Sequence, residues 1–128
     1  MIVDTSALVA VVKGEPEAAI YLTRLLDQPV KVSAVTAFEF GMVVDGWKDE
    51  QSSRDADLLL LSIEAEIVVV DEGLAQAARA AYRRFGKGNH PARLNFGDCF
   101  AYALASETGE PLLFKGDDFV RTDVRSAL

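Results

Sequence analysis

Thiols, long apolar runs and a leading basic segment are scarce or missing in this chain of 128 residues. Its one cysteine, Cys99, excludes a disulfide within the chain, and a lone thiol is compatible with a reducing compartment. No stretch approaches the ~18 consecutive apolar residues that a membrane-spanning helix needs. The first residues reach an acid at Asp4 without the basic start of a secretion signal. We therefore expect a soluble cytoplasmic protein with no membrane partner.

Basic residues are also in short supply, since 13 Lys and Arg face 20 Asp and Glu, for a net charge of −7. Such a chain repels nucleic acid on average, which argues against non-specific coating of DNA. From Gly73 to Gly97, however, there is no acid at all. This window is a candidate RNA-binding segment, and a solvated helix face or a surface for a partner protein are the alternatives. Its basic residues are Arg79, Arg83, Arg84, Lys87 and Arg93.

Half of the residues are apolar, which is enough for one folded domain over residues 1–128. Short apolar runs alternate with helical patterns, and this alternation predicts an α/β sandwich around a mainly parallel sheet. We expect strands at Ile2–Val3, Val30–Val35, Ile67–Val70 and Leu112–Phe114. The expected helices are Ala7–Val12, Glu17–Leu26, one that begins after Thr36, Ala56–Ile63, Leu74–Phe85 and Cys99–Glu107, with a polar turn at 49–55.

Two local patterns allow sharper predictions. Thr36 and Glu39 have the spacing of a capping box, in which each side chain bonds to the other's backbone N–H. Ile67–Val70 is apolar without alternation, and this is typical of a strand buried on both faces. Both predictions depend on local sequence alone.

Acidic residues follow several of the expected strands. Asp4 ends the first strand, Glu39 lies in the helix after the second, and Asp98 begins a late helix, while Asp117 and Asp118 follow the last strand. Each acid alone is also typical of a helix cap or a turn. Together they are expected at one edge of a parallel sheet, where the carboxyl ends of the strands meet.

Carboxylates that converge repel one another, so they should be protonated or bound to a metal. The nearest base in sequence, Lys115, could neutralise only part of their charge. A site made of oxygen ligands suits Mg²⁺, with Mn²⁺ as a substitute, rather than Zn²⁺. Such ions activate water and stabilise the transition state of phosphodiester hydrolysis. The acids therefore predict a metal-dependent nuclease.

Three segments resemble the motifs of PIN-domain proteins, in particular the VapC toxins of bacterial type II toxin–antitoxin pairs. They are Met1–Ala7 (Met-Ile-Val-Asp-Thr-Ser-Ala), Leu94–Ala103 around Asn95-Phe96-Gly97-Asp98, and Leu112–Phe119, which ends in Gly-Asp-Asp-Phe. The likeness spans the whole chain. It implies a PIN-like three-layer sandwich with helices on both faces of the sheet.

The resemblance also implies a Mg²⁺-dependent endoribonuclease that inhibits translation by cutting RNA. Asp4 and Asp98 match the metal ligands, and Glu39 matches an acid that supports the metal or its waters. Asp117 is preferred as the fourth catalytic acid, with Asp118 as the alternate. Thr5 and Ser6 are either hydroxyls of the metal shell or plain helix caps.

The partners implied by the same likeness are a cognate VapB-type antitoxin and a second copy of the chain in a homodimer. DNA would be bound only through the antitoxin. Phe40 is expected in the core, while Met42 and Trp47 are candidates for a partner groove or ordinary packing. His90 is expected to contact RNA or to shape its loop, and Cys99 to be a buried structural residue.

Two other functions remain as alternatives. A PIN fold without nuclease activity would act as a partner-binding module. A receiver-type domain would use Asp71 as its phosphoacceptor, with Asp4 as a metal ligand and Lys115 at a strand end. The receiver interpretation leaves Glu39 and Asp98 without a role.

Overall fold

The computed structural model describes residues 1–128, which fold into four short strands and six helices. The strands are β1 (Ile2–Val3), β2 (Lys31–Ser33), β3 (Glu66–Val68) and β4 (Leu112–Leu113). The helices are α1 (Thr5–Lys13), α2 (Ala18–Asp27), α3 (Ala34–Asp45), α4 (Glu50–Ser62), α5 (Glu72–Phe85) and α6 (Phe96–Thr108). None of these helices has the length and apolar character to span a bilayer.

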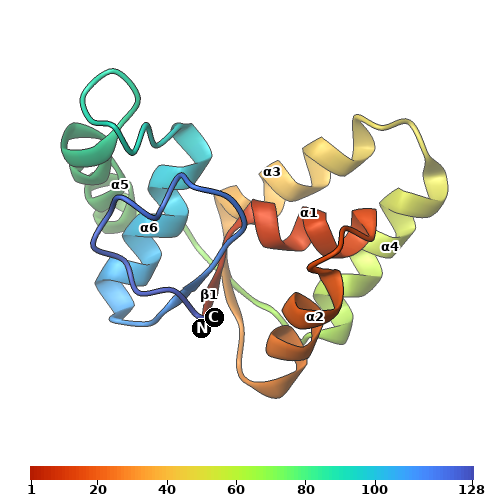
Figure 1. Ribbon diagram of the computed structural model, residues 1–128. Helices are drawn as coiled ribbons and strands as arrows, with labels where there is room; N and C mark the ends of the chain where they lie inside the picture. The colour runs from red at the N-terminus through yellow and green to blue at the C-terminus, as the bar shows by residue number, and fades with distance from the viewer.

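The sheet has the order β3-β2-β1-β4, and every neighbouring pair of strands is parallel. Helices α1 to α4 lie on one side of it and α5 and α6 on the other (Figure 1). This arrangement confirms the expected α/β sandwich of three layers with a parallel sheet. All carboxyl ends of the strands therefore lie at one edge.

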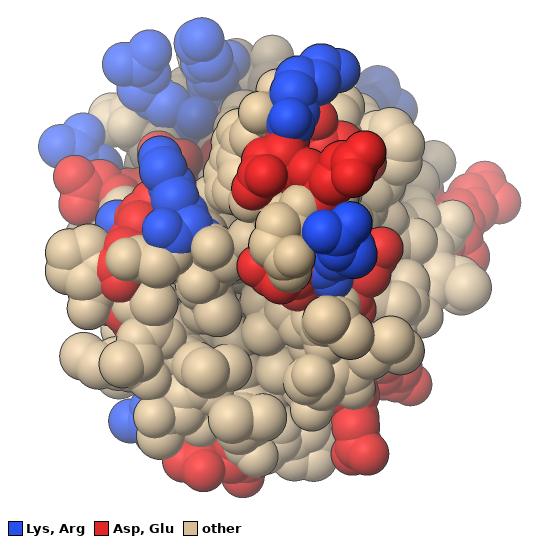
Figure 2. Space-filling view, turned by 90° about the vertical axis from the view of Figure 1, so that its right-hand side faces the viewer, with Lys and Arg blue, Asp and Glu red and all other residues tan.

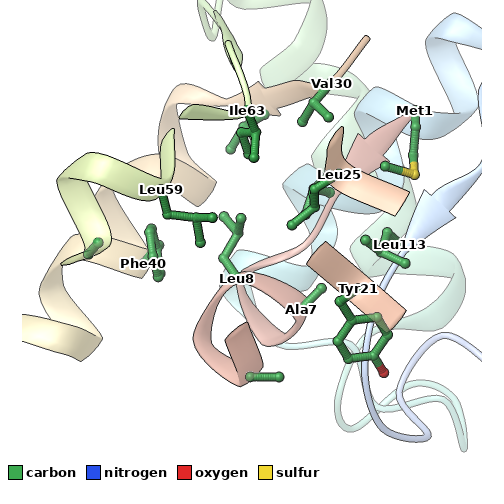
Figure 3. Close-up of a cluster of buried hydrophobic side chains, with 14 of the residues drawn as sticks. Met1, Ala7, Leu8, Tyr21, Leu25, Val30, Phe40, Leu59, Ile63 and Leu113 are labelled. Carbon is green, nitrogen blue, oxygen red and sulfur yellow. The ribbon is translucent and has the colours of Figure 1, made fainter. Parts of the chain in front are cut away.

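Alternate residues of the central strands supply two separate cores. Val3 and Leu113 belong to the core under α1 to α4, whose side chains are shown in Figure 3, whereas Ile2 and Leu112 belong to the core under α5 and α6. Phe40 is 1% exposed in the first core, as predicted. Because strand side chains alternate between faces, two apolar residues in a row bury β1 on both sides.

The prediction of a doubly buried strand at Ile67–Val70 is wrong. Strand β3 covers only Glu66–Val68, and it is an edge strand. Ile67 is 45% exposed, and Val69, just beyond the strand, is 74% exposed. The branched side chains favour extended backbone, but the order of the strands in the sheet decides their burial.

Several helix starts also differ from the prediction. Ser33 caps α3, since its Oγ accepts the N–H of Thr36 at 3.0 Å, so the capping box of Thr36 and Glu39 does not form. Asp4, rather than Thr5 or Ser6, caps α1. Helix α4 begins at Glu50, inside the expected turn, with Asp49 as its cap. In each case a short polar residue one position or more upstream supplies the first oxygen acceptor.

Candidate active site

Asp4 lies where β1 ends and α1 begins, and its side chain is buried. Its Oδ2 accepts the Ser6 N–H at 2.9 Å and the Ser6 hydroxyl at 2.6 Å. Its Oδ1 is buried with no hydrogen-bond partner. Burial raises the pKa of Asp4 above its usual value, and the charge of Glu39 adds to this, although the bonds from Ser6 oppose it. A buried oxygen without a partner is costly unless a proton or a cation satisfies it.

Asp98 lies in the first turn of α6 and is also buried. Its Oδ2 accepts the N–H of Asn95 at 3.0 Å, while its own N–H donates to Asn95 Oδ1 at 2.9 Å. Burial raises the pKa of Asp98 to about 7, and the charges of Asp4, Asp118 and Glu39 raise it further. The negative charges of Asp4, Asp118 and Glu39 are thus all felt at Asp98.

Glu39 lies on α3, and its side chain reaches both α1 and α6. The Thr5 hydroxyl donates to Glu39 Oε1 at 2.5 Å. The same carboxylate lies against Gly97, where a Cβ would overlap its oxygen atoms. Thr5 therefore holds Glu39 beside Asp98, one residue from Gly97.

Ser6 links Asp4 to the segment that follows β4. Its Oγ donates to Asp4 and accepts the backbone N–H of Lys115 at 2.9 Å. The Lys115 ammonium forms ion pairs with Glu15 and Glu17. The prediction that Lys115 partly neutralises the acid pocket is therefore not supported, since its charge is balanced at the turn between α1 and α2.

Asp117 and Asp118 are both exposed on the turn after β4. The charge of Asp118 raises the pKa of Asp98, and Asp117 has no such effect among the causes of that shift. This observation favours Asp118 over Asp117, the reverse of the preference from the sequence. Asp117 nevertheless lines the same cavity as Asp118.

The five basic residues of the acid-free window do not form one surface. Lys87 and Arg93 line a cavity of about 580 Å³ together with Asp118. Arg84 lies 3.2 Å from Asp123 in an ion pair and stacks over the ring of Phe85. Arg79 borders a separate, apolar pocket beside Tyr82 and Phe96. Arg83 is exposed near the end of α5.

The remaining residues considered in the sequence analysis are His90, Cys99, Met42 and Trp47. His90 Nδ1 accepts the N–H of Ala92 at 3.0 Å, and its ring packs edge-on against Phe85. Cys99 is buried, and burial raises the pKa of its thiol to about 11, which makes it a poor nucleophile. Met42 is 56% exposed and Trp47 is 37% exposed.

Sequence reasoning missed two residues of this region. Gly97 is required by the close approach of Glu39, and a glycine before Asp98 in the motif was the available signal. Arg121 lines the cavity with Asp118, but it lies outside the acid-free window and had no signal of its own.

The carboxylate oxygens of the site are the kind of ligand that a hard cation prefers. No three Asp, Glu, His or Cys side chains are already close enough together to hold a metal ion. Mg²⁺, however, is usually bound through one or two carboxylates and keeps several waters, so a closed cage is not required. Such an ion would be a partner for the Oδ1 of Asp4, and it would stabilise the charged form of Asp98, whose pKa is raised by burial. Asp4 and Asp98 therefore fit the ligand role.

Comparison with known proteins identifies the family to which the chain is similar. Residues 1–125 match the model of the PIN domain. The chain is 46% identical over 125 residues to Ribonuclease VapC of Mycolicibacterium smegmatis, covering 97% of each chain. It is 48% identical over 130 aligned positions to Ribonuclease VapC28 of Mycobacterium tuberculosis, covering all of this chain and 98% of that one.

Solved structures with the same fold are more distant in sequence. The crystal structure of M. tuberculosis VapC20, described as a toxin that cleaves the sarcin–ricin loop, superposes with a TM-score of 0.76 at 19% identity, over 96% of this chain and 95% of that one. A toxin–antitoxin complex from Klebsiella pneumoniae gives a TM-score of 0.71 at 20% identity, over 95% and 92%.

Proposed function

The chain belongs to the PIN-domain family and to its VapC branch, and on this premise we propose that it is a Mg²⁺-dependent endoribonuclease toxin. The reaction is hydrolysis of an RNA phosphodiester bond, with inhibition of translation as its consequence. A transfer RNA or a ribosomal RNA loop is the substrate class. The relatives named as ribonucleases support this proposal, and so does the VapC20 neighbour that cleaves a ribosomal RNA loop.

The observation that carries the proposal is the pair of buried carboxylates, Asp4 and Asp98, at the carboxyl edge of a parallel sheet. One oxygen of Asp4 is without a partner, and Asp98 has a pKa of about 7. Buried acids with this little compensation weaken the metal-free fold, and groups perturbed in this way are concentrated at functional sites. Metal binding is the function that fits their chemistry and the family.

Each residue of the site has its own role in the proposed reaction. Asp4 and Asp98 would hold the ion, which supplies an activated water and positive charge at the phosphate when bound. Thr5 keeps the Glu39 carboxylate beside them, where it can accept hydrogen bonds from water. Asp118, or Asp117 beside it, completes the acidic pocket. Lys87 and Arg93, which line a cavity with Asp118, would contact the RNA strand there.

Cleavage of total bacterial RNA by the purified protein tests the proposal. We expect discrete fragments with Mg²⁺ and with Mn²⁺, and none with EDTA or with Asp98→Asn. Asp57→Asn, on the exposed face of α4, is the matched control and should cut like the wild type. Fragments that form equally in EDTA would contradict a metal-dependent reaction. Folded wild-type protein that never cuts would favour the partner-binding module instead.

A cognate VapB-type antitoxin is the partner that we propose. The structural neighbour from Klebsiella pneumoniae is described as a toxin–antitoxin complex. Helices α2 and α4 expose apolar side chains, with Leu26 at 58% and Leu61 at 73%. Figure 2, which looks onto the side where α4 lies in Figure 1, shows a broad area without charged side chains and charges at its edges. An apolar helix of an antitoxin would cover such a surface. Leu61→Lys should weaken that complex without reducing RNA cleavage.

A homodimer is proposed from the family, and the surface beside the site offers a place for it. Phe38 is 71% exposed and Phe96 is 75% exposed, and each precedes a residue of the Glu39–Gly97 contact. Sedimentation of the wild type and of Phe96→Lys at the same concentration would compare the dimeric fraction of the two proteins. Binding to operator DNA is expected only for the complex with the antitoxin, since the free chain is acidic.

The receiver alternative is not favoured by the surroundings of Asp71, its expected phosphoacceptor. Asp71 caps α5, accepting the N–H of Leu74 at 2.8 Å, and it follows an edge strand. It lies on none of the elements that carry Asp4 and Asp98. Acetyl phosphate should therefore leave Asp71 unlabelled.

A further inference from the structure

A cavity next to Asn95, the residue that bonds to Asp98, combines both signs of charge. It measures about 580 Å³, which is within the range of small-ligand sites. Lys87 and Arg93 come from the segment between α5 and α6, and Arg121 comes from the segment after β4. Asp118, whose charge acts on Asp98, lines the same cavity. Asn95 also lines the cavity, and it exchanges two hydrogen bonds with Asp98, so the cavity with its three cations adjoins the residue that holds Asp98.

These three cations are not used within the protein. Lys87, Arg93 and Arg121 are exposed, and none of them forms an ion pair or a side-chain hydrogen bond. Asp117 and Asp118 line the same cavity without pairing to them. In a chain with a net charge of −7, three unpaired cations around one hollow indicate an anionic ligand.

The turn that carries Arg121 is anchored on both sides. Phe119 is 2% exposed and packs against Phe114, with ring centres 5.1 Å apart. Asp123 accepts the Tyr102 hydroxyl at 2.5 Å and pairs with Arg84. The backbone that carries Asp118 and Arg121 is therefore fixed at Phe119 and at Asp123.

The segment that carries Lys87 and Arg93 is also ordered. The Lys87 N–H donates to the Leu94 carbonyl at 2.9 Å, and the Arg93 N–H donates to the His90 carbonyl at 3.0 Å. Arg93 adopts a left-handed backbone with φ of 58°, where glycine would be less strained.

We propose that Arg121, with Lys87 and Arg93, binds the RNA phosphate next to the bond that is cleaved. This inference rests on the proposed ribonuclease activity and adds to it a residue outside the acid-free window. Arg121 presents a guanidinium group that matches two phosphate oxygens at once. The acids take the reacting phosphate, and the cations take its neighbour along the strand.

The test compares wild type, Arg121→Gln and Arg54→Gln, which loses the same charge from exposed α4. Steady-state cleavage of an RNA oligonucleotide, made from the sequence that the wild type cuts, should show KM about tenfold higher for Arg121→Gln. Its kcat should stay within twofold of the wild type, because the neighbouring phosphate is bound equally before and during the reaction. Arg54→Gln should match the wild type.

Binding in EDTA provides a second readout that does not need cleavage. The affinity for a fluorescent single-stranded RNA of 20 nucleotides is measured against salt concentration. One lost phosphate contact should reduce the slope of log K against log salt by about 0.7 for Arg121→Gln and leave it unchanged for Arg54→Gln.

The outcomes separate the two proposals. If the wild type cuts RNA and Arg121→Gln has an unchanged KM and salt slope, the assignment of Arg121 is wrong and the nuclease stands. If both arginine variants weaken binding equally, only net charge matters and the subsite is wrong. If the wild type neither cuts nor binds RNA, the proposed function fails and the subsite with it.

Discussion

The Glu39 carboxylate lies directly against Gly97, so a residue of α3 fills the space that a side chain on α6 would need. This contact places Glu39 one residue from Asp98, and the Thr5 hydroxyl holds it from the other side at 2.5 Å. The position of one acid thus depends on the absence of a Cβ on the helix that carries another.

Gly97→Ala should displace Glu39 and reduce cleavage about a hundredfold, since misplacement by an ångström can cost that much. The fold should persist, because the atoms in the way belong to the end of a flexible side chain. Gly41→Ala is the control, since a Cβ there meets nothing within 4 Å. Cleavage rates and circular dichroism check both variants. Equal rates for the two alanine variants would contradict this role of Gly97.

Asp98→Asn should stabilise the metal-free protein at pH 8. The folded pKa of Asp98, about 7, lies above its usual value of 3.8. The stability that this group contributes is therefore present below pH ~4 and is lost as the pH rises through about 7. The loss amounts to roughly 4 kcal/mol at most, at 1.36 kcal/mol per pKa unit. The asparagine oxygen can still accept the Asn95 N–H, but carries no charge.

Urea unfolding in EDTA at pH 5 and pH 8 measures the effect. The gain of Asp98→Asn over the wild type should be larger at pH 8, and Mg²⁺ should reduce it by stabilising the wild type alone. Asp57→Asn, exposed on α4, should change neither value. A gain that is the same at both pH values would show that ionisation of Asp98 does not weaken the fold.

Asp118→Asn should lower cleavage more than Asp117→Asn. The charge of Asp118 raises the pKa of Asp98, whereas Asp117 is not among the causes of that shift, so Asp118 is the acid that we expect to act at the site. We expect a loss of at least tenfold for Asp118→Asn, and a smaller one for Asp117→Asn. Both residues are exposed, so neither variant should alter the melting temperature appreciably. The opposite order of rates would restore Asp117 as the fourth acid.

Ser6→Ala should weaken the fold by about 1–3 kcal/mol, because the backbone N–H of Lys115 loses its acceptor. Asp4 would lose a hydrogen bond of 2.6 Å at the same time, so cleavage should fall too. Ser52→Ala removes a similar bond, to the exposed Asp49, and should cost less. Urea unfolding of the two variants decides the point. Equal losses would mean that the link from α1 to Lys115 adds nothing.

Local chemistry decided much of what could be predicted. The order of strands and helices, the parallel sheet and the core position of Phe40 follow from apolar runs, branched residues and short connections. The acids Asp4, Glu39 and Asp98 were placed at one edge by the same logic, because parallel strands present their carboxyl ends together. These predictions combine local patterns with the general rule that parallel strands end at the same edge of a sheet.

Tertiary structure alone decided the rest. The branched run at Ile67–Val70 indicates a strand, but only the order of the sheet makes β3 an edge and leaves Val69 exposed. Glu39 pairs with Thr5 rather than with its own helix start, since α1 and α3 lie side by side. Arg121 and Lys87 are far apart in sequence, and they share a cavity because the chain returns past α6. Burial, repulsion between distant acids and shared cavities depend on which segments meet, and the sequence by itself does not carry that information.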